Sequence, residues 1–311
     1  MAYLSLIGGL ILLFVSGDTL VKGSVQLSRH FKLSTLVIGL TIVAFGTSAP
    51  ELFVSVKAAF DGVPDLAIGN VIGSNIANIG LIIGFVSVFM PIAVANKSIV
   101  KDWVVMNLAT LMLLFSSWNG FITFWEGVSF ALALVIYLVW SIVRVRKDRN
   151  VAVKVLAPTM SGPKAFIYVV LAIVGLYFGA GLLVDGAREI ALSWGVSDRV
   201  IGVSIVAFGT SVPELATSMI ALYRKENDIS VGNIIGSNIF NVWAVLGLTS
   251  LVTPLPVYDW IEVLSDVLIS VFFAVLLFLF ILPLGRGVIT RIKGAILLSL
   301  YFIYIFIIYS L

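Results

Sequence analysis

The segment VAFGTSAPEL, residues 43–52, lies inside a long apolar stretch and returns with one change as VAFGTSVPEL at residues 206–215. Each copy places a proline and an ionisable glutamate in hydrophobic sequence. Proline lacks a backbone N–H, and its ring crowds the preceding helical turn. Pro50 therefore predicts a helix that is broken around residues 45–49, and we expect the second copy to break in the same way.

The composition is that of a membrane protein. The 311 residues are 60% hydrophobic and 11% charged, with a mean hydropathy of +1.15, whereas soluble domains carry about 25% charged residues. Cysteine is absent, which excludes disulfides and thiolate metal sites. A transmembrane helix needs roughly 20 apolar residues. We predict an all-α integral membrane protein with ten spans, at residues 3–28, 34–60, 66–91, 102–117, 120–143, 165–191, 199–222, 229–252, 260–283 and 289–310.

Basic residues concentrate in alternate loops of this arrangement. Fifteen of the 19 lysines and arginines follow spans one, three, five, seven and nine. Lysine and arginine accumulate in cytoplasmic loops. The prediction is therefore a multi-pass protein of the cell (plasma) membrane with both termini extracellular.

A fixed offset of 163 residues relates the two halves of the chain. Glu51 aligns with Glu214, and IGNVIGSNIANIGLIIG (68–84) aligns with VGNIIGSNIFNVWAVLG (231–247). Five spans is an odd number, so the second half should enter the membrane inverted. Inverted repeats are typical of secondary transporters, which bind substrate near the midplane between the repeats. The predicted organisation is a first five-span repeat at 1–143, a cytoplasmic linker at 144–164 and a second, inverted five-span repeat at 165–311.

The broken helices predict a polar site. Unpaired backbone groups in lipid cost several kcal/mol each, so a break survives only where it is buried or lines a cavity. The break frees carbonyls near Ala44, adds the hydroxyls of Thr47 and Ser48, and places Glu51 at the positive end of a half-helix. The second copy supplies Ala207, Thr210, Ser211 and Glu214.

The second repeated block extends the same site. Ser74 and Asn78 are four residues apart and share one helix face, while the small Gly69 and Gly73 allow a close approach to the broken helix. The other half repeats this set as Ser237, Asn241, Gly232 and Gly236.

These donors predict a hard-cation site. Carboxylates, hydroxyls, amides and carbonyls suit Ca²⁺ and Na⁺, and neither sulfur nor imidazole contributes. A lone intramembrane glutamate could be a structural hydrogen-bonding group. Two at equivalent positions, each beside a proline break, favour a functional pair that neutralises one divalent cation.

The motifs GTSAPE with GNVIGSNIANIG, and GTSVPE with GNIIGSNIFNVW, resemble the two alpha repeats of the sodium/calcium exchanger family, within the cation/calcium antiporter superfamily. The length resembles its compact prokaryotic members. The resemblance implies that Ca²⁺ binds between Glu51 and Glu214, with backbone oxygens of Thr47 and Thr210. It also implies surrounding Na⁺ sites formed by Glu51, Ser74 and the Ala44 carbonyl, by Glu214, Ser237 and the Ala207 carbonyl, with Ser48 and Ser211 shared and Asn78 and Asn241 as the central polar pair.

Asn241 departs from close prokaryotic relatives, which often carry aspartate at that position. The fixed charge of the predicted site is −2 rather than −3, so one Ca²⁺ would neutralise it and three Na⁺ would exceed it by one charge. The GTSxPE form favours Na⁺ coupling, because the proton-coupled branch of the superfamily usually carries a GNxxE form.

The sequence therefore predicts an electrogenic Na⁺/Ca²⁺ antiporter that works by alternating access. It would be a secondary transporter with no enzymatic activity, no cofactor, no nucleic acid and no protein partner, in contact with membrane lipid. The open alternatives are antiport of H⁺ for Ca²⁺ or another divalent cation, and a passive cation channel. Duplicated halves with broken helices fit a gated, two-sided site better than an open pore.

Overall fold

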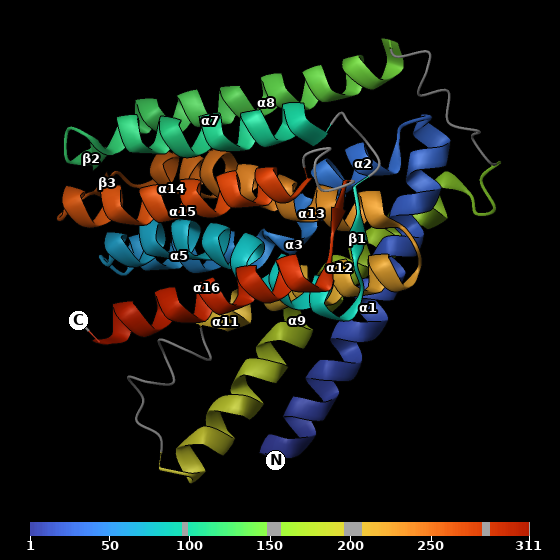
Figure 1. Ribbon diagram of the computed structural model, residues 1–311, viewed down its shortest axis with the longest axis horizontal. Helices are drawn as coiled ribbons and strands as arrows, with labels where there is room; N and C mark the ends of the chain where they lie inside the picture. Colours follow the sequence, from blue (N-terminus) through green and yellow to red (C-terminus); the bar gives the residue numbers. More distant parts are fainter. Residues whose placement is uncertain (95–98, 148–156, 196–206, 282–286, 311) are drawn as a thin grey trace.

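The structure is a computed structural model that describes residues 1–94, 99–147, 157–195, 207–281 and 287–310. Helices dominate these residues (Figure 1). The first half contains helices α1 (Ala2–Phe31), α2 (Thr35–Ile38), α3 (Ala44–Thr47), α4 (Ala49–Phe60), α5 (Pro64–Ala77), α6 (Gly84–Phe89), α7 (Ile99–Ser117) and α8 (Phe124–Lys147), with π-helices η1 (Gly39–Val43) and η2 (Asn78–Ile83). The second half contains α9 (Gly162–Ser193), α11 (Ala207–Thr210), α12 (Val212–Tyr223), α13 (Asn227–Phe240), π-helix η5 (Asn241–Leu246), α14 (Gly247–Val252), α15 (Trp260–Ile281) and α16 (Arg291–Ser310).

Eight helices of the described residues are long and apolar enough to span a membrane. A ninth span is possible from the bent pair Thr35–Thr47 and Ala49–Phe60. These nine differ from the predicted spans by at most four residues at either end. The remaining predicted span, 199–222, includes residues 196–206, which lie outside the described ranges. Ten spans and an inverted topology therefore stay predictions.

Local backbone structure recurs at the 163-residue offset. Helix α12 begins and ends 163 residues after α4, and the same holds for α13 with α5, η5 with η2, and α14 with α6. A π-helix is rare and often marks a functional site. Its return at the equivalent position means that the repeated sequence encodes the same interruption of the α-helix twice.

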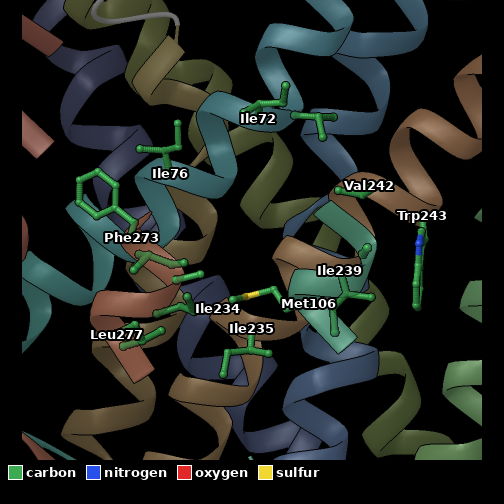
Figure 2. Packing of buried hydrophobic residues seen from close by; sticks show 14 of the residues in the cluster. Ile72, Ile76, Met106, Ile234, Ile235, Ile239, Val242, Trp243, Phe273 and Leu277 are labelled. Carbon is green, nitrogen blue, oxygen red and sulfur yellow. The ribbon is translucent and has the colours of Figure 1, made fainter. Parts of the chain in front are cut away.

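The centre of the molecule is formed by the two spans that carry these π-helices. Of the apolar stretch in each long helix, 78% is buried in Pro64–Phe89 and 89% in Asn227–Val252, against 33% or less in the other six. The apolar core lies around them, where Met106 of α7 lies close to Ile235 and Ile239 of α13 (Figure 2). The outer helices expose large apolar side chains, as expected where lipid surrounds them.

Helices α1 and α9 form a separate, obliquely oriented pair (Figure 1). Glycines line their contact, because a Cβ added at Gly9 would lie 2.6 Å from the backbone nitrogen of Leu183. At Gly186 it would lie 2.6 Å from the backbone nitrogen of Leu6. The two backbones therefore touch directly, as small residues allow in membrane helix pairs.

Two short antiparallel ribbons join loops of the first and second halves. Strand β1 (Ile92–Ala93) pairs with β4 (Val288–Ile289), and β2 (Phe121–Ile122) pairs with β3 (Leu255–Pro256). The facing residues of each pair include side chains that are fully buried. The ribbons therefore fix the ends of the central spans, which carry the candidate site.

Candidate cation site

Both GTSxPE motifs interrupt their helices at the serine. Ser48 separates α3 from α4 with φ −82° and ψ 4°, and Ser211 separates α11 from α12 with φ −87° and ψ 0°. The first interruption bends the chain by 43°. Pro50 and Pro213 occupy the first turn of the following helix, where a missing N–H costs nothing. The predicted break is therefore confirmed within the motif.

The two motif glutamates lie at the N-terminal ends of α4 and α12. Glu51 and Glu214 are both fully buried, and their carboxylates are close enough to repel each other. Each occupies the first turn of its helix, where the helix dipole favours a negative charge. Two like charges held together in an apolar interior require a cation, a proton or several donors to compensate them.

Hydroxyls of the first motif reach the glutamate of the second. Ser48 donates to Glu214 Oε1 at 3.4 Å, and Ser237 of α13 donates to the same oxygen at 3.3 Å. Thr47 Oγ1 lies 3.2 Å from Ser237 Oγ. On the opposite side, Ser74 and Thr210 lie beside the Glu51 carboxylate. Each carboxylate is thus flanked by a serine of its own half and a hydroxyl of the other half.

Four asparagines meet where the two central spans cross. Asn78 Nδ2 donates to Asn238 Oδ1 at 2.8 Å, and Asn241 Nδ2 donates to Asn75 Oδ1 at 3.1 Å. All four side chains are 0–2% exposed. The central pair predicted from the sequence therefore lies within a larger amide cluster.

Several buried oxygens of this region accept no hydrogen bond from the described residues, although the hydroxyls of Ser74 and Thr210 lie near the Glu51 carboxylate. They are the two carboxylate oxygens of Glu51, Glu214 Oε2, and the amide oxygens of Asn78 and Asn241. Buried polar atoms are almost always hydrogen-bonded, so such a group needs an explanation. Five acceptor oxygens from two carboxylates and two amides match the ligand chemistry of a hard cation.

Most predicted site residues lie in or beside this cluster, including Thr47, Ser48, Ser74, Thr210, Ser237 and both glutamates. Ser211 Oγ is buried without a partner among the described residues. The Ala44 carbonyl accepts the Ser48 N–H at 2.9 Å, so the prediction that the helix break frees this carbonyl is wrong. In the second motif, the Ser211 N–H donates to Phe208 O at 3.1 Å.

The close helix approach predicted at the repeated glycines is found in the second half of the chain. A Cβ added at Gly232 would lie 2.8 Å from Leu36 O, and one at Gly236 would lie 2.7 Å from Leu40 O, which confirms close packing there. No described atom lies within 4 Å of a Cβ added at Gly69 or Gly73. Residues at the positions equivalent to 36 and 40 fall within 196–206, outside the described ranges.

Sequence reasoning missed the asparagines that support the site. Asn233 accepts from Thr47 Oγ1 at 2.9 Å and donates to Ser218 Oγ at 3.2 Å. Asn70 donates to the backbone oxygen of Glu51 at 3.3 Å. The signal was available, because Asn70 with Asn233 and Asn75 with Asn238 are identical pairs at the 163-residue offset.

The sequence model of the family described as "Sodium/calcium exchanger protein" matches residues 1–143 and 164–310 of this chain. The chain belongs to this family. Among relatives of this exchanger, the putative antiporter CaxA of Alkalimonas amylolytica is 38% identical over 309 residues, covering 97% of both chains. The sodium/calcium exchanger MaX1 of Methanosarcina acetivorans is 29% identical over 339 residues, covering 96% of both.

A solved structure also resembles this exchanger over nearly its whole length. The sodium-calcium exchanger NCX_Mj, soaked with 2.5 mM Na⁺ and 0.1 mM Ca²⁺, matches with a TM-score of 0.82 and 35% identity. The match covers 98% of this chain and 97% of that chain. The protein is therefore a multi-pass membrane transporter of the cation/Ca²⁺ antiport type.

Proposed function

We propose that the protein exchanges Na⁺ for Ca²⁺ across the plasma membrane by alternating access. The supporting observation is the group of buried, donor-free oxygens on Glu51, Glu214, Asn78 and Asn241. Two carboxylates in a dry interior would repel each other strongly unless a cation lay between them. A Ca²⁺ ion supplies two positive charges and takes oxygen ligands from several groups.

In this proposal Ca²⁺ binds between Glu51 and Glu214 with backbone oxygens of Thr47 and Thr210. Na⁺ ions compete for the same carboxylates, which couples release of one ion to binding of the other. The Na⁺ ligands would come from Ser74, Ser237, Ser48, Ser211 and the carbonyls of Ala44 and Ala207, and Asn78 and Asn241 would form the central polar pair that faces either cation. The Ala44 carbonyl accepts the Ser48 N–H and also lies 3.4 Å from Thr47 Oγ1. The Thr47 hydroxyl makes a shorter bond to Asn233 Oδ1 at 2.9 Å, so a cation at the Ala44 carbonyl would displace only the longer Thr47 contact.

The site charge sets the electrical behaviour of the exchange. Asn241 is neutral, so the two glutamates give a fixed charge of −2. One Ca²⁺ neutralises this charge, and three Na⁺ would leave a net charge of +1. Exchange of three Na⁺ for one Ca²⁺ would therefore move charge across the membrane. The proposed arrangement has both termini extracellular, with inverted repeats at 1–143 and 165–311 joined by a cytoplasmic linker at 144–164.

The proposal is tested by Ca²⁺ uptake into vesicles that contain the purified protein. We expect an outward Na⁺ gradient to drive uptake, and expect a K⁺ gradient of the same size to drive none. With three Na⁺ leaving for each Ca²⁺ that enters, Ca²⁺ uptake would carry one positive charge out of the vesicle. An inside-positive potential set by K⁺ and valinomycin should therefore speed Ca²⁺ uptake. The same potential should slow Ca²⁺ efflux that is driven by Na⁺ entry.

Three experimental outcomes would contradict the proposal. Uptake driven equally well by a proton gradient without Na⁺ would assign H⁺ coupling instead. Single-channel currents in a planar bilayer would assign a pore. Uptake that ignores every cation gradient would exclude antiport by the proposed site.

A further inference from the structure

We infer that Asn75 and Asn238 are positioning residues that orient the amide oxygens of Asn241 and Asn78 as cation ligands. The inference rests on the proposed function, because it concerns the same site. Neither Asn75 nor Asn238 needs to touch the ion. Each instead holds the ligand that belongs to the opposite half of the chain.

The four amides form a crossed network. Asn78 of the first half donates to Asn238 Oδ1, and Asn241 of the second half donates to Asn75 Oδ1, at 2.8 and 3.1 Å. A side-chain amide has one oxygen and one nitrogen. With the nitrogen of Asn78 engaged in this way, its oxygen is left as the donor-free atom, and the same holds for Asn241.

The direction of each amide therefore decides whether it attracts or repels a cation. If the acceptor on Asn238 were removed, the Asn78 amide could rotate and present its NH₂ group instead of its oxygen. Asn78 lies one helical turn after Ser74, which is beside the Glu51 carboxylate. A reversed amide would thus place positive partial charge on the face that the cation must use.

The positioning residues are themselves anchored by the helix interruption. The Asn78 N–H donates to Ser74 O, and the Asn241 N–H donates to Ser237 O, as the final bonds of α5 and α13. The next carbonyl in each helix is that of Asn75 or Asn238. Each of these accepts the side-chain Nδ2 of the other residue, and both distances are 3.2 Å.

These bonds lie directly before each π-helix begins. A change from α- to π-helical bonding leaves carbonyls without their usual donor, and a buried carbonyl of that kind is costly. Asn75 and Asn238 satisfy each other's carbonyl and have one acceptor oxygen left for the opposite ligand. The two halves therefore set each other's cation ligands across the helix crossing.

The test is a set of double-mutant cycles on the full-length protein in lipid nanodiscs, with Ca²⁺ binding measured by calorimetry in Na⁺-free buffer. Residues that orient metal ligands typically contribute 10–100-fold to affinity. We expect Asn75→Ala and Asn238→Ala each to weaken Ca²⁺ binding by about tenfold or more. The matched control is Asn107→Ala on α7, where the amide donates to the backbone oxygen of Trp103 in its own helix, and this change should leave the affinity unchanged.

The pattern of coupling distinguishes positioning from general support. Asn238→Ala combined with Asn78→Ala should weaken binding little more than either change alone, and so should Asn75→Ala with Asn241→Ala. The pairs that share a helix, Asn75 with Asn78 and Asn238 with Asn241, should be close to additive. Groups that act through one another are non-additive, whereas independent groups add.

The outcomes separate this inference from the proposed function. If the wild type binds no Ca²⁺, the proposed function is wrong. If the wild type binds Ca²⁺ but Asn75→Ala and Asn238→Ala lower only the melting temperature, the inference alone is wrong. Additive behaviour of the crossed pairs would also overturn it. Should an alanine variant fail to fold, the serine variant at that position, which keeps a polar group but cannot make both bonds, is measured with the same expected pattern.

Discussion

Glu51→Gln and Glu214→Gln are each expected to abolish Ca²⁺ transport. Either change halves the fixed charge of the site and replaces one carboxylate oxygen with an NH₂ group that repels a cation. Breaking a buried charge pairing by removing one partner costs about 3–5 kcal/mol. At 1.4 kcal/mol per factor of ten, transport should fall by more than about 100-fold.

The measurement is initial ⁴⁵Ca²⁺ uptake into vesicles with an outward Na⁺ gradient and equal amounts of each variant. Glu262→Gln is the matched control, because Glu262 is an exposed glutamate in the first turn of α15. The control should retain uptake at the wild-type rate. Wild-type flux in either Glu51→Gln or Glu214→Gln would mean that the binding site lies elsewhere.

Gly236→Val is expected to eliminate transport by forcing the central helices apart. A Cβ at residue 236 would lie 2.7 Å from Ala44 Cβ and 2.7 Å from the backbone oxygen of Leu40. Backbone atoms cannot rotate away as a side chain can, so α13 would have to shift. Overpacking of this kind costs about 1–3 kcal/mol or more. Ser237, the next residue, would also lose its position beside Glu214.

This effect is measured as the melting temperature in detergent together with Ca²⁺ uptake in vesicles. The control is Gly8→Val in α1, where no described atom lies within 4 Å of an added Cβ. We expect the control to fold and transport normally. A Gly236→Val variant with wild-type uptake would show that the contact between α13 and residues 40–44 is not needed at the site.

The helix breaks could be predicted from sequence because their cause is local. Pro50 and Pro213 act on their own turns, and the interruption was found within the motif at Ser48 and Ser211. Span positions were also predictable, since long apolar runs encode them directly. The π-helices were not predicted, because the apolar sequence continues through Asn78–Ile83 without any change that marks a different hydrogen-bond register.

The pairings within the site needed the structure. The recurrence of Asn75 as Asn238 is visible in the letters, but not that each bonds the opposite half. At the Ala44 carbonyl, the sequence led to a wrong prediction about a backbone hydrogen bond. Its helical bond to Ser48 survives the break at the motif, because a proline removes the donor four residues after Gly46 rather than after Ala44.

The glycine-lined contact between α1 and α9 has a mechanical consequence. At Gly9 and Gly186 the two backbones meet without a side chain between them to yield or rotate. Because the backbones of α1 and α9 are in direct contact at these positions, a displacement of one helix would be transmitted to the other. Sliding of α1 along the rest of the bundle would therefore carry α9 with it, and the first long helices of the two halves would move as one body.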